Sequence, residues 1–176
     1  MRVLVTTASK HGSTRQIGEV IADQLQQHGH QLLCRDVEEV GDADIVQAGA
    51  IVLGTAVYGA RLLSAGSAFA SRLAHEFGGL VWLFGVGLKN VTVDPLRVTT
   101  TQPAEMGYRA GRYPVFGGVV ETATLSAAER ALIGAVGAHG KDLRDLELVQ
   151  AWAALVAVQV SAAERAQGSR STLPVV

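Results

Sequence analysis

The amino-acid sequence predicts a doubly wound α/β domain, with a parallel sheet between two layers of helices. Short runs of Val, Ile and Leu alternate along the chain with segments of helical periodicity, which is the order typical of such domains. The β-type runs cover residues 2–6, 31–36, 50–55, 80–85 and 115–121. The first, third and fourth runs are almost continuously apolar, as expected for strands that are buried on both faces of a parallel sheet.

Helices are predicted between and after these strands. Periodic apolar positions indicate helices over residues 14–28, 65–77, 126–136 and 147–165. Gly29 suits a left-handed residue at the end of the first helix, and Ser126 with Glu129 forms a capping-box signature. A loop of small residues after the first of five strands favours the strand order 2-1-3-4-5. In that order, ligands bind beside the carboxyl ends of the first and third strands.

The composition restricts the classes of protein to which this chain can belong. The chain has 176 residues, of which 48% are hydrophobic, and a mean hydropathy of +0.25. These values suit one domain over residues 1–166, with a short flexible tail over residues 167–176. A net charge of −1 gives no electrostatic footprint for nucleic acid. Cys34 is the single cysteine, which excludes a disulfide framework within the chain, and no signal peptide is visible, so we expect a reducing cytoplasm.

Residues 149–163 are the most apolar helix candidate. Gln150, Gln159 and Ser161 interrupt this run, which falls short of the ~20 apolar residues needed to cross a bilayer. We therefore expect a helix that packs on the sheet and presents small residues outward. A homodimer contact or a peripheral membrane contact is the alternative.

The loop after the first strand, residues 9–14, has the sequence Ser-Lys-His-Gly-Ser-Thr. Backbone N–H groups at a helix N-terminus have no intrahelical acceptor, and the helix dipole favours an anion there. The hydroxyls of Ser9, Ser13 and Thr14 add donors, and Gly12 allows a ligand to come close. The loop therefore predicts a phosphate site. The alternative is a simple turn in which Ser13 or Thr14 caps the helix.

Other phosphate-binding classes are excluded by the spacing of this loop. It contains neither the Gly-x-x-x-x-Gly-Lys-Ser/Thr pattern of nucleotide hydrolases nor the Gly-x-Gly-x-x-Gly pattern of dinucleotide-binding domains. It also lacks the nucleophilic cysteine of the small phosphotyrosine phosphatases. Lys10, His11 and Arg15 are expected to offset the charge of a phosphate, and their alternative role is that of solvated side chains.

Two further loops are expected at the same edge of the sheet. Residues 54–59, Gly-Thr-Ala-Val-Tyr-Gly, follow the third strand, and residues 84–88, Phe-Gly-Val-Gly-Leu, follow the fourth. Tyr58 offers a flat face for a planar ring system, or is a surface tyrosine in a turn. Residues 86–112 lack a clear helical pattern and are expected to form a lid that faces the substrate or a partner, or else a solvated insertion.

The order and spacing of residues 9–14, 52–59 and 115–120 resemble those of flavodoxin-domain proteins. The phosphate loop of that family is a Ser/Thr-x-Thr-Gly-Asn-Thr-type segment, and His11 and Ser13 depart from its usual Thr and Asn. The chain looks most like the branch that contains the menaquinone-dependent protoporphyrinogen oxidases. The resemblance covers nearly the whole chain and implies a flavodoxin-like three-layer sandwich with FMN as the cofactor.

The resemblance also implies which residues would surround the FMN. No catalytic side chain and no metal ligand is expected, because the flavin N5 would be the reacting centre. The residues expected to hold the phosphate are Ser9, Lys10, His11, Gly12, Ser13 and Thr14. Those expected to border the isoalloxazine are Thr55, Ala56, Val57, Tyr58 and Gly59 on one side, and Val86, Gly87 and Leu88 on the other.

Three functions are compatible with these features. The first is an FMN-dependent oxidoreductase that passes electrons between a small substrate and a quinone-type or similar acceptor. The second is a flavodoxin-type shuttle that docks on redox proteins and has no substrate of its own. Such shuttles are usually strongly acidic, and a pI of about 6.5 argues against this function. The third is a binding module without a cofactor, which the three intact loops argue against.

Overall fold

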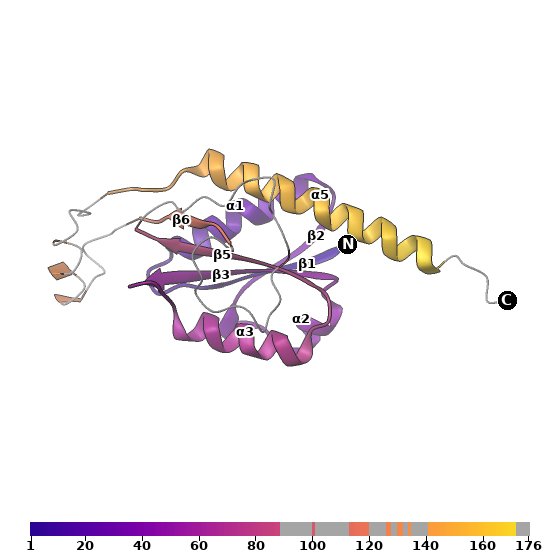
Figure 1. Cartoon of the computed structure of the whole chain (residues 1–176), viewed down its shortest axis with the longest axis horizontal. Helices are drawn as coiled ribbons and strands as arrows, with labels where there is room; N and C mark the ends of the chain where they lie inside the picture. Colours follow the sequence, from indigo (N-terminus) through magenta and orange to yellow (C-terminus); the bar gives the residue numbers. More distant parts are fainter. Residues whose placement is uncertain are drawn as a thin grey trace.

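A parallel sheet with the strand order β2-β1-β3-β5-β6 forms the centre of the protein (Figure 1). The structure is a computed structural model that describes residues 1–88, 100, 113–119, 126–127, 130–131, 134 and 141–171. The parallel strands are β1 (Arg2–Ala8), β2 (Gln31–Asp36), β3 (Ala50–Tyr58), β5 (Leu80–Gly87) and β6 (Val115–Gly117). A short additional strand, β4 (Arg61–Leu62), pairs with β3 in the antiparallel direction.

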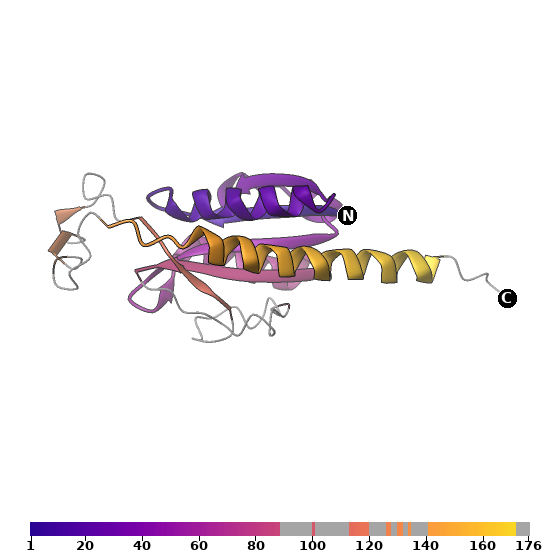
Figure 2. The same cartoon turned by 90° about the horizontal axis from the view of Figure 1, so that it is seen from above.

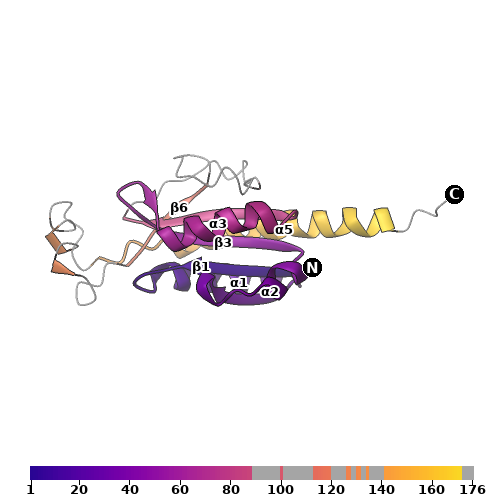
Figure 3. The same ribbon diagram turned by 90° about the horizontal axis from the view of Figure 1, so that it is seen from below.

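Helices cover both faces of this sheet. α1 (Ser13–Gln27) and α5 (Leu146–Ser171) lie side by side on one face, as Figure 2 shows from above. The 3-10 helix η1 (Val37–Glu39), α2 (Asp42–Gln47) and α3 (Ser64–Glu76) lie on the other face, which Figure 3 shows from below. The predicted three-layer sandwich and the predicted order of the five parallel strands are therefore confirmed, and β4 is an addition to them.

The core beneath α1 and α5 joins aliphatic and aromatic side chains. Ile17, Ile21 and Leu25 follow one face of α1 and are fully buried against the sheet. Beside them, Phe84, Phe116 and Trp152 form a triangle with ring centroids 5.9 to 6.1 Å apart. The rings meet at inclined angles, which is a favourable arrangement for aromatic pairs. This cluster fixes α5 and β6 to the central strands.

The opposite face is packed mainly by aliphatic residues. Leu4, Ile51 and Leu53 project from β1 and β3 toward α3, where they meet Phe69 and Leu73. The central strands β1 and β3 are therefore buried on both faces, which explains their continuous apolar sequences. By contrast, β2 is an edge strand with several exposed positions and a more polar sequence.

The ends of several elements differ from the prediction. β3 continues to Tyr58 and β5 to Gly87, whereas β6 ends at Gly117. The short α2 and η1 were not predicted, because an element of one or two turns has too few positions for a periodic pattern. Gly29 has a φ of +86°, which confirms the predicted left-handed residue after α1. Most of the predicted helix over 126–136 and most of the segment 86–112 lie outside the described residues, although residues 127, 130–131 and 134 are described and helical.

α5 is longer than predicted. It has 26 residues and ends at Ser171, so the first part of the expected flexible tail is helical. By length and composition alone, Leu146–Ser169 is apolar enough to cross a membrane. However, Val149, Ala153, Val156 and Val160 form one fully buried stripe against the sheet, as in the core helix that we predicted. The helix spans about 39 Å, which exceeds the ~23 Å of a seven-residue strand, so its end extends past the sheet (Figure 2).

Candidate functional site

The structure brings the three predicted loop regions to one edge of the sheet. β1, β3 and β5 are parallel neighbours, with Ala8 paired to Thr55 and Ala56 paired to Val86. Their carboxyl ends therefore lie together, as the strand arrows in Figure 1 show. β2 and β3 lie on opposite sides of β1. The chain passes from β1 to β2 in one direction across the sheet and then crosses back to β3, so the strand order reverses between β1 and β3. Ligands of open α/β sheets bind at such a reversal.

Residues 9–12 lead from β1 into α1 and leave an open helix N-terminus. Gly12 is the N-cap residue, with a φ of +84°, and a Cβ built on it would meet no atom within 4 Å. The first turn of α1 contains no acidic residue. Ser13, Thr14 and Arg15 open the helix, where backbone N–H groups lack an intrahelical acceptor. The space, the donors and the charge therefore all suit an anion.

The hydroxyl side chains of this loop have different surroundings. Gly12 rather than Ser13 or Thr14 is the N-cap and it has no side chain that could cap the helix, so the alternative in which Ser13 or Thr14 is the capping residue is wrong. The Ser13 Oγ accepts a hydrogen bond from the Val119 amide at 2.9 Å, which leaves its hydroxyl hydrogen able to donate. Thr14 is only 1% exposed. The other side chains of the loop are half-buried or exposed: Ser9, Lys10 and His11.

Arg15 turns away from the loop. Its Nε donates to the Asp36 Oδ1 at 3.2 Å, and its Nη2 donates to the Asp36 Oδ2, while Thr7 donates to the same carboxylate at 3.1 Å. The hydrogen bonds and charge of Asp36 raise the pKa of Arg15. Arg15 is therefore engaged at the end of β2 and does not lie where the sequence analysis expected it to offset phosphate charge.

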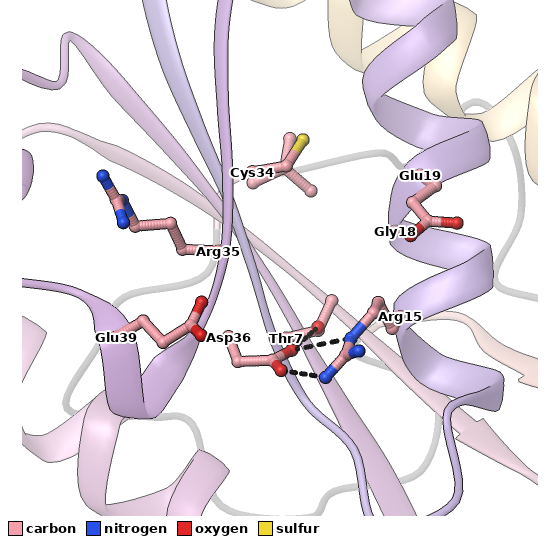
Figure 4. Close-up of a pocket in the computed structure, with 9 residues that line it drawn as sticks. Thr7, Arg15, Gly18, Glu19, Cys34, Arg35, Asp36 and Glu39 are labelled. Carbon is pink, nitrogen blue, oxygen red and sulfur yellow. Dashed lines mark hydrogen bonds and ion pairs between the residues drawn. The ribbon is translucent and has the colours of Figure 1, made fainter.

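A pocket of about 240 Å³ opens on that side of the sheet, between α1 and β2 (Figure 4). It lies on the β2 side of β1, whereas the reversal of strand order lies on the β3 side. Cys34 faces this pocket, and partial burial raises the pKa of its thiol, with the charges of Asp23 and Glu19 adding to the effect. The lining residues are Val5, Thr7, Arg15, Gly18, Glu19, Cys34, Arg35, Asp36 and Glu39.

After β3 the chain turns in a tight hairpin rather than a longer loop. Tyr58 pairs with Arg61 across Gly59 and Ala60, whose φ angles are +53° and +62°. Two successive positive φ angles are the signature of a type I′ hairpin turn. Ala60 has a Cβ, so its left-handed conformation costs about 1 to 2 kcal/mol. Backbone strain of this kind occurs preferentially at functional sites.

The side chains of the hairpin region divide into buried and exposed. Thr55 is fully buried, donates to the Ala56 carbonyl at 3.3 Å, and lies beneath Gly66, where an added Cβ would be 2.3 Å from its Oγ1. Ala56 is also buried, so these two residues would present mainly backbone to a ligand. Tyr58 is 43% exposed and carries the aromatic face at this edge.

The end of β5 forms the third part of the edge. The Val86 side chain is 5% exposed and packs in the aromatic core, so it would reach a ligand only through its backbone. The Gly87 carbonyl accepts a hydrogen bond from the Gly118 amide at 2.9 Å. Leu88 is 39% exposed. Of the three residues predicted here, Leu88 therefore offers the side-chain surface.

Two segments that were not among the predicted site residues also reach this site. Residues 117–119 lie against the first turn of α1, and residues 142–144 lie against residues 117–119. The consecutive glycines Gly117 and Gly118, which belong to the 115–120 motif, are also a signal for close backbone approach. The residues that they approach are distant in sequence, so no local pattern could identify them.

The described residues contain no cluster of metal-binding side chains. Across this part of the chain, no group of three or more His, Cys, Asp or Glu side chains is placed to hold a metal ion. His75 lies exposed on α3, away from the carboxyl edge.

Comparisons with known proteins are consistent with this geometry. Residues 4–147 match the family model described as Flavodoxin domain, whereas no curated protein matches the chain. The flavodiiron core of Flv1 from Synechocystis sp. PCC6803 is similar over 93% of this chain and 36% of its own, with 12% identity and a TM-score of 0.58. The flavodiiron protein from Giardia intestinalis is similar over 92% of this chain and 36% of its own, with 16% identity and a TM-score of 0.56.

A flavodoxin matches over its full length. The Streptococcus pneumonia TIGR4 flavodoxin is similar over 90% of this chain and 99% of its own, with 19% identity and a TM-score of 0.53. At these identities the likeness shows the fold. The chain spans about a third of the length of the flavodiiron proteins and nearly all of the length of this flavodoxin.

Proposed function

The chain belongs to the flavodoxin domain family, and we propose that it binds FMN at the carboxyl edge of its sheet and transfers electrons. The observation that carries this proposal is the open, acid-free N-terminus of α1 beside Gly12, next to the reversal of strand order between β1 and β3. Such a site suits a phosphate group. The exposed Tyr58 on the neighbouring hairpin suits a planar ring.

The donors present fit the phosphate of FMN. The amides of Gly12, Ser13 and Thr14 and the Ser13 hydroxyl would donate to its oxygens, with Ser9, Lys10 and His11 at the rim of the loop. A phosphomonoester carries a charge of roughly −2 at neutral pH. The positive end of the helix dipole and the absence of a carboxylate in the first turn both favour that charge.

The hairpin and the end of β5 fit the ring system. Tyr58 would lie against one side of the isoalloxazine, with the backbone of Thr55, Ala56, Val57 and Gly59 beside its polar edge. Leu88 and the backbone of Val86 and Gly87 would form the other side. When bound, FMN supplies the electron-carrying chemistry, and the protein contributes binding and orientation.

For the reaction, we propose an oxidoreductase that passes electrons between a small substrate and a quinone-type or similar acceptor, in a cytoplasmic setting. The net charge of −1 supports this function over a shuttle for redox proteins, because shuttles rely on strong acidity for docking. The likeness to the protoporphyrinogen oxidase branch remains a prediction from the sequence. It makes protoporphyrinogen and a menaquinone analogue the first substrates to assay.

The test of the cofactor is the visible absorption spectrum of the purified protein, with mass identification of any released flavin. We expect FMN at about one per chain after reconstitution. A protein that takes up no flavin would overturn both redox functions and leave the binding module. With FMN bound, turnover of small donors with a quinone supports an oxidoreductase, whereas reduction only through redox proteins supports the shuttle.

The double variant Ser13→Ala with Thr14→Ala tests the phosphate loop. We expect it to lose FMN affinity markedly, because it removes the hydroxyl donors from the first turn of α1. Unchanged FMN affinity in this variant, with the fold intact, would show that the phosphate binds elsewhere.

A further inference from the structure

Two chain segments cross the first turn of α1 together. Residues 117–119 leave β6, and residues 142–144 precede α5. Val119 and Asp142 form an antiparallel bridge, and the Leu143 amide donates to the Gly118 carbonyl at 3.1 Å. We call these two segments the brace.

The brace is bonded to α1 at two positions. The Val119 amide donates to the Ser13 Oγ at 2.9 Å, and the Arg144 Nη1 donates to the Gln16 Oε1 at 2.7 Å. Ser13 and Gln16 are three residues apart and therefore lie on one face of the helix. At Gly12, before the first turn, no atom of the described residues lies within 4 Å of an added Cβ.

Arg144 is itself held within the brace. Its Nε lies 2.9 Å from the Asp142 Oδ1 and its Nη2 lies 2.6 Å from the Asp142 Oδ2, in a bidentate pair. The Arg144 amide also donates to the Asp142 Oδ1 at 3.1 Å. A bidentate pair fixes the plane of the guanidinium, so the donor that reaches Gln16 is directed by Asp142.

The glycines of the brace leave no space between it and its neighbours. A Cβ on Gly118 would lie 2.9 Å from the Ser13 Oγ and 3.0 Å from the Val86 Cγ1. A Cβ on Gly117 would lie 1.9 Å from the Leu143 carbonyl oxygen. The brace thus touches the phosphate loop and the end of β5 at the same point, so any added atom at Gly118 would push Ser13 out of place.

We propose that the brace sets the affinity of the loop for phosphate. Ser13 is the hydroxyl donor that the brace positions, and Arg144 is a positioning residue that holds the brace on α1. This inference rests on the proposed function. The Val119 amide occupies one acceptor site of the Ser13 Oγ and thereby directs the hydroxyl hydrogen to other acceptors. Donors that are already oriented bind an anion more tightly, because less side-chain freedom is lost on binding.

The first test compares Arg144→Gln with Arg72→Gln. Both arginine side chains are 26% exposed and both bond to carboxylates, but Arg72 lies on α3, where it pairs with Glu76 and Asp42. For each variant and the wild-type protein, the dissociation constants of FMN and riboflavin are measured by flavin fluorescence, and the unfolding midpoint is measured in urea. Riboflavin lacks the phosphate, so the ratio of the two constants isolates the phosphate loop.

We expect Arg144→Gln to weaken FMN binding about 10-fold and to leave riboflavin binding unchanged. A fold-change of that size corresponds to the loss of roughly one charge-assisted hydrogen bond, here the one from the misplaced Ser13 hydroxyl to the phosphate. Arg72→Gln should leave the FMN to riboflavin ratio at the wild-type value. Unchanged FMN affinity in Arg144→Gln, or an equal loss for FMN and riboflavin, would overturn the brace proposal alone. A wild-type protein that binds no FMN would overturn the proposed function as well.

Gly118→Ala provides a second test that removes no donor. Its matched control is Gly78→Ala, because a Cβ on Gly78 would meet no atom within 4 Å. We expect Gly118→Ala to lower FMN affinity at least as much as Arg144→Gln, again without an equal loss for riboflavin. An FMN to riboflavin ratio equal to that of Gly78→Ala would count against the proposal.

Discussion

The turns after β1 and β3 leave the same edge of the sheet but are built in opposite ways. After β1, one residue with positive φ, Gly12, leads directly into α1. After β3, the strand continues to Tyr58 and reverses through Gly59 and Ala60, both with positive φ. The first turn leaves open backbone donors, whereas the second presents an aromatic side chain at the tip of a strained hairpin.

This difference matches two parts of one ligand. Helix geometry supplies charge and N–H groups, which favour an anion, and these are supported from outside by residues 117–119 and 142–144. The hairpin supplies the flat ring of Tyr58, and its one charged residue is Arg61. We therefore expect variants in the first turn to weaken the binding of FMN but not of riboflavin, and variants in the hairpin to weaken the binding of both flavins alike.

The largest effect is expected from Gly12→Asp. It places a carboxylate where the phosphate would bind, and like charges at an anion site repel, so we expect FMN affinity to fall by about 100-fold or roughly 2.7 kcal/mol. Gly12→Asn is the control, because Asn has the same shape and tolerates positive φ as Asp does. If the Asp and Asn variants bind FMN equally, the charge at this position is irrelevant and the phosphate lies elsewhere.

Tyr58→Leu is expected to have the next largest effect. Stacking of a planar ring on an aromatic side chain contributes about 1 to 3 kcal/mol, so FMN and riboflavin should both bind about 10-fold more weakly. Tyr58→Phe keeps the ring and should retain most of the affinity. Because Tyr58 is 43% exposed, the unfolding midpoint should change little. A loss confined to FMN would contradict the division between the two turns.

Substitutions at the two turn residues of the hairpin are expected to have a smaller effect, on the free energy of unfolding. Ala60 has a φ of +62°, so Ala60→Gly removes steric strain and should raise the free energy of unfolding by up to about 1 kcal/mol. Gly59→Ala, at a φ of +53°, should lower it by about as much. Urea unfolding of the two variants measures both changes. Equal changes of the same sign would show that the turn adopts another conformation in solution.

The smallest effect is expected on the pH dependence of stability, through the pair of Asp142 and Arg144 that supports the first turn of α1. Hydrogen bonds from the Arg144 side chain and amide lower the pKa of Asp142 from 3.8 to about 2. A carboxyl group with a lowered pKa in the folded state contributes stability above its unfolded pKa and loses it as the pH falls from about 4 to about 2. The difference in unfolding midpoint between the wild type and Asp142→Asn should therefore shrink over that range. A constant difference would show that the pair with Arg144 does not form.

Much of the fold follows from local patterns in the sequence. The apolar runs of β1, β3 and β5 and the periodic positions Ile17, Ile21 and Leu25 identify buried strands and an amphipathic helix. Together with the loop after β1, they led to the correct strand order. Gly29 was also identified correctly, because a helix end followed by glycine has one common conformation.

The site was less predictable, because its details depend on residues that meet only in the folded chain. Residues 56–58 lie beyond the predicted strand, yet pairing of Ala56 with β5 and of Val57 and Tyr58 with β4 extends β3 through them. Arg15 was expected near the phosphate, but Asp36, brought close by the pairing of β1 with β2, holds it elsewhere. The contacts of Ser13 with Val119 join positions that no sequence periodicity relates.

The most direct test of the account is a calorimetric titration of the wild-type protein with FMN and, separately, with riboflavin. We expect one FMN per chain and FMN binding tighter than riboflavin by at least about 10-fold, because the N-terminus of α1 acts on the phosphate alone. Equal affinities for the two flavins, or no binding of FMN, would contradict it.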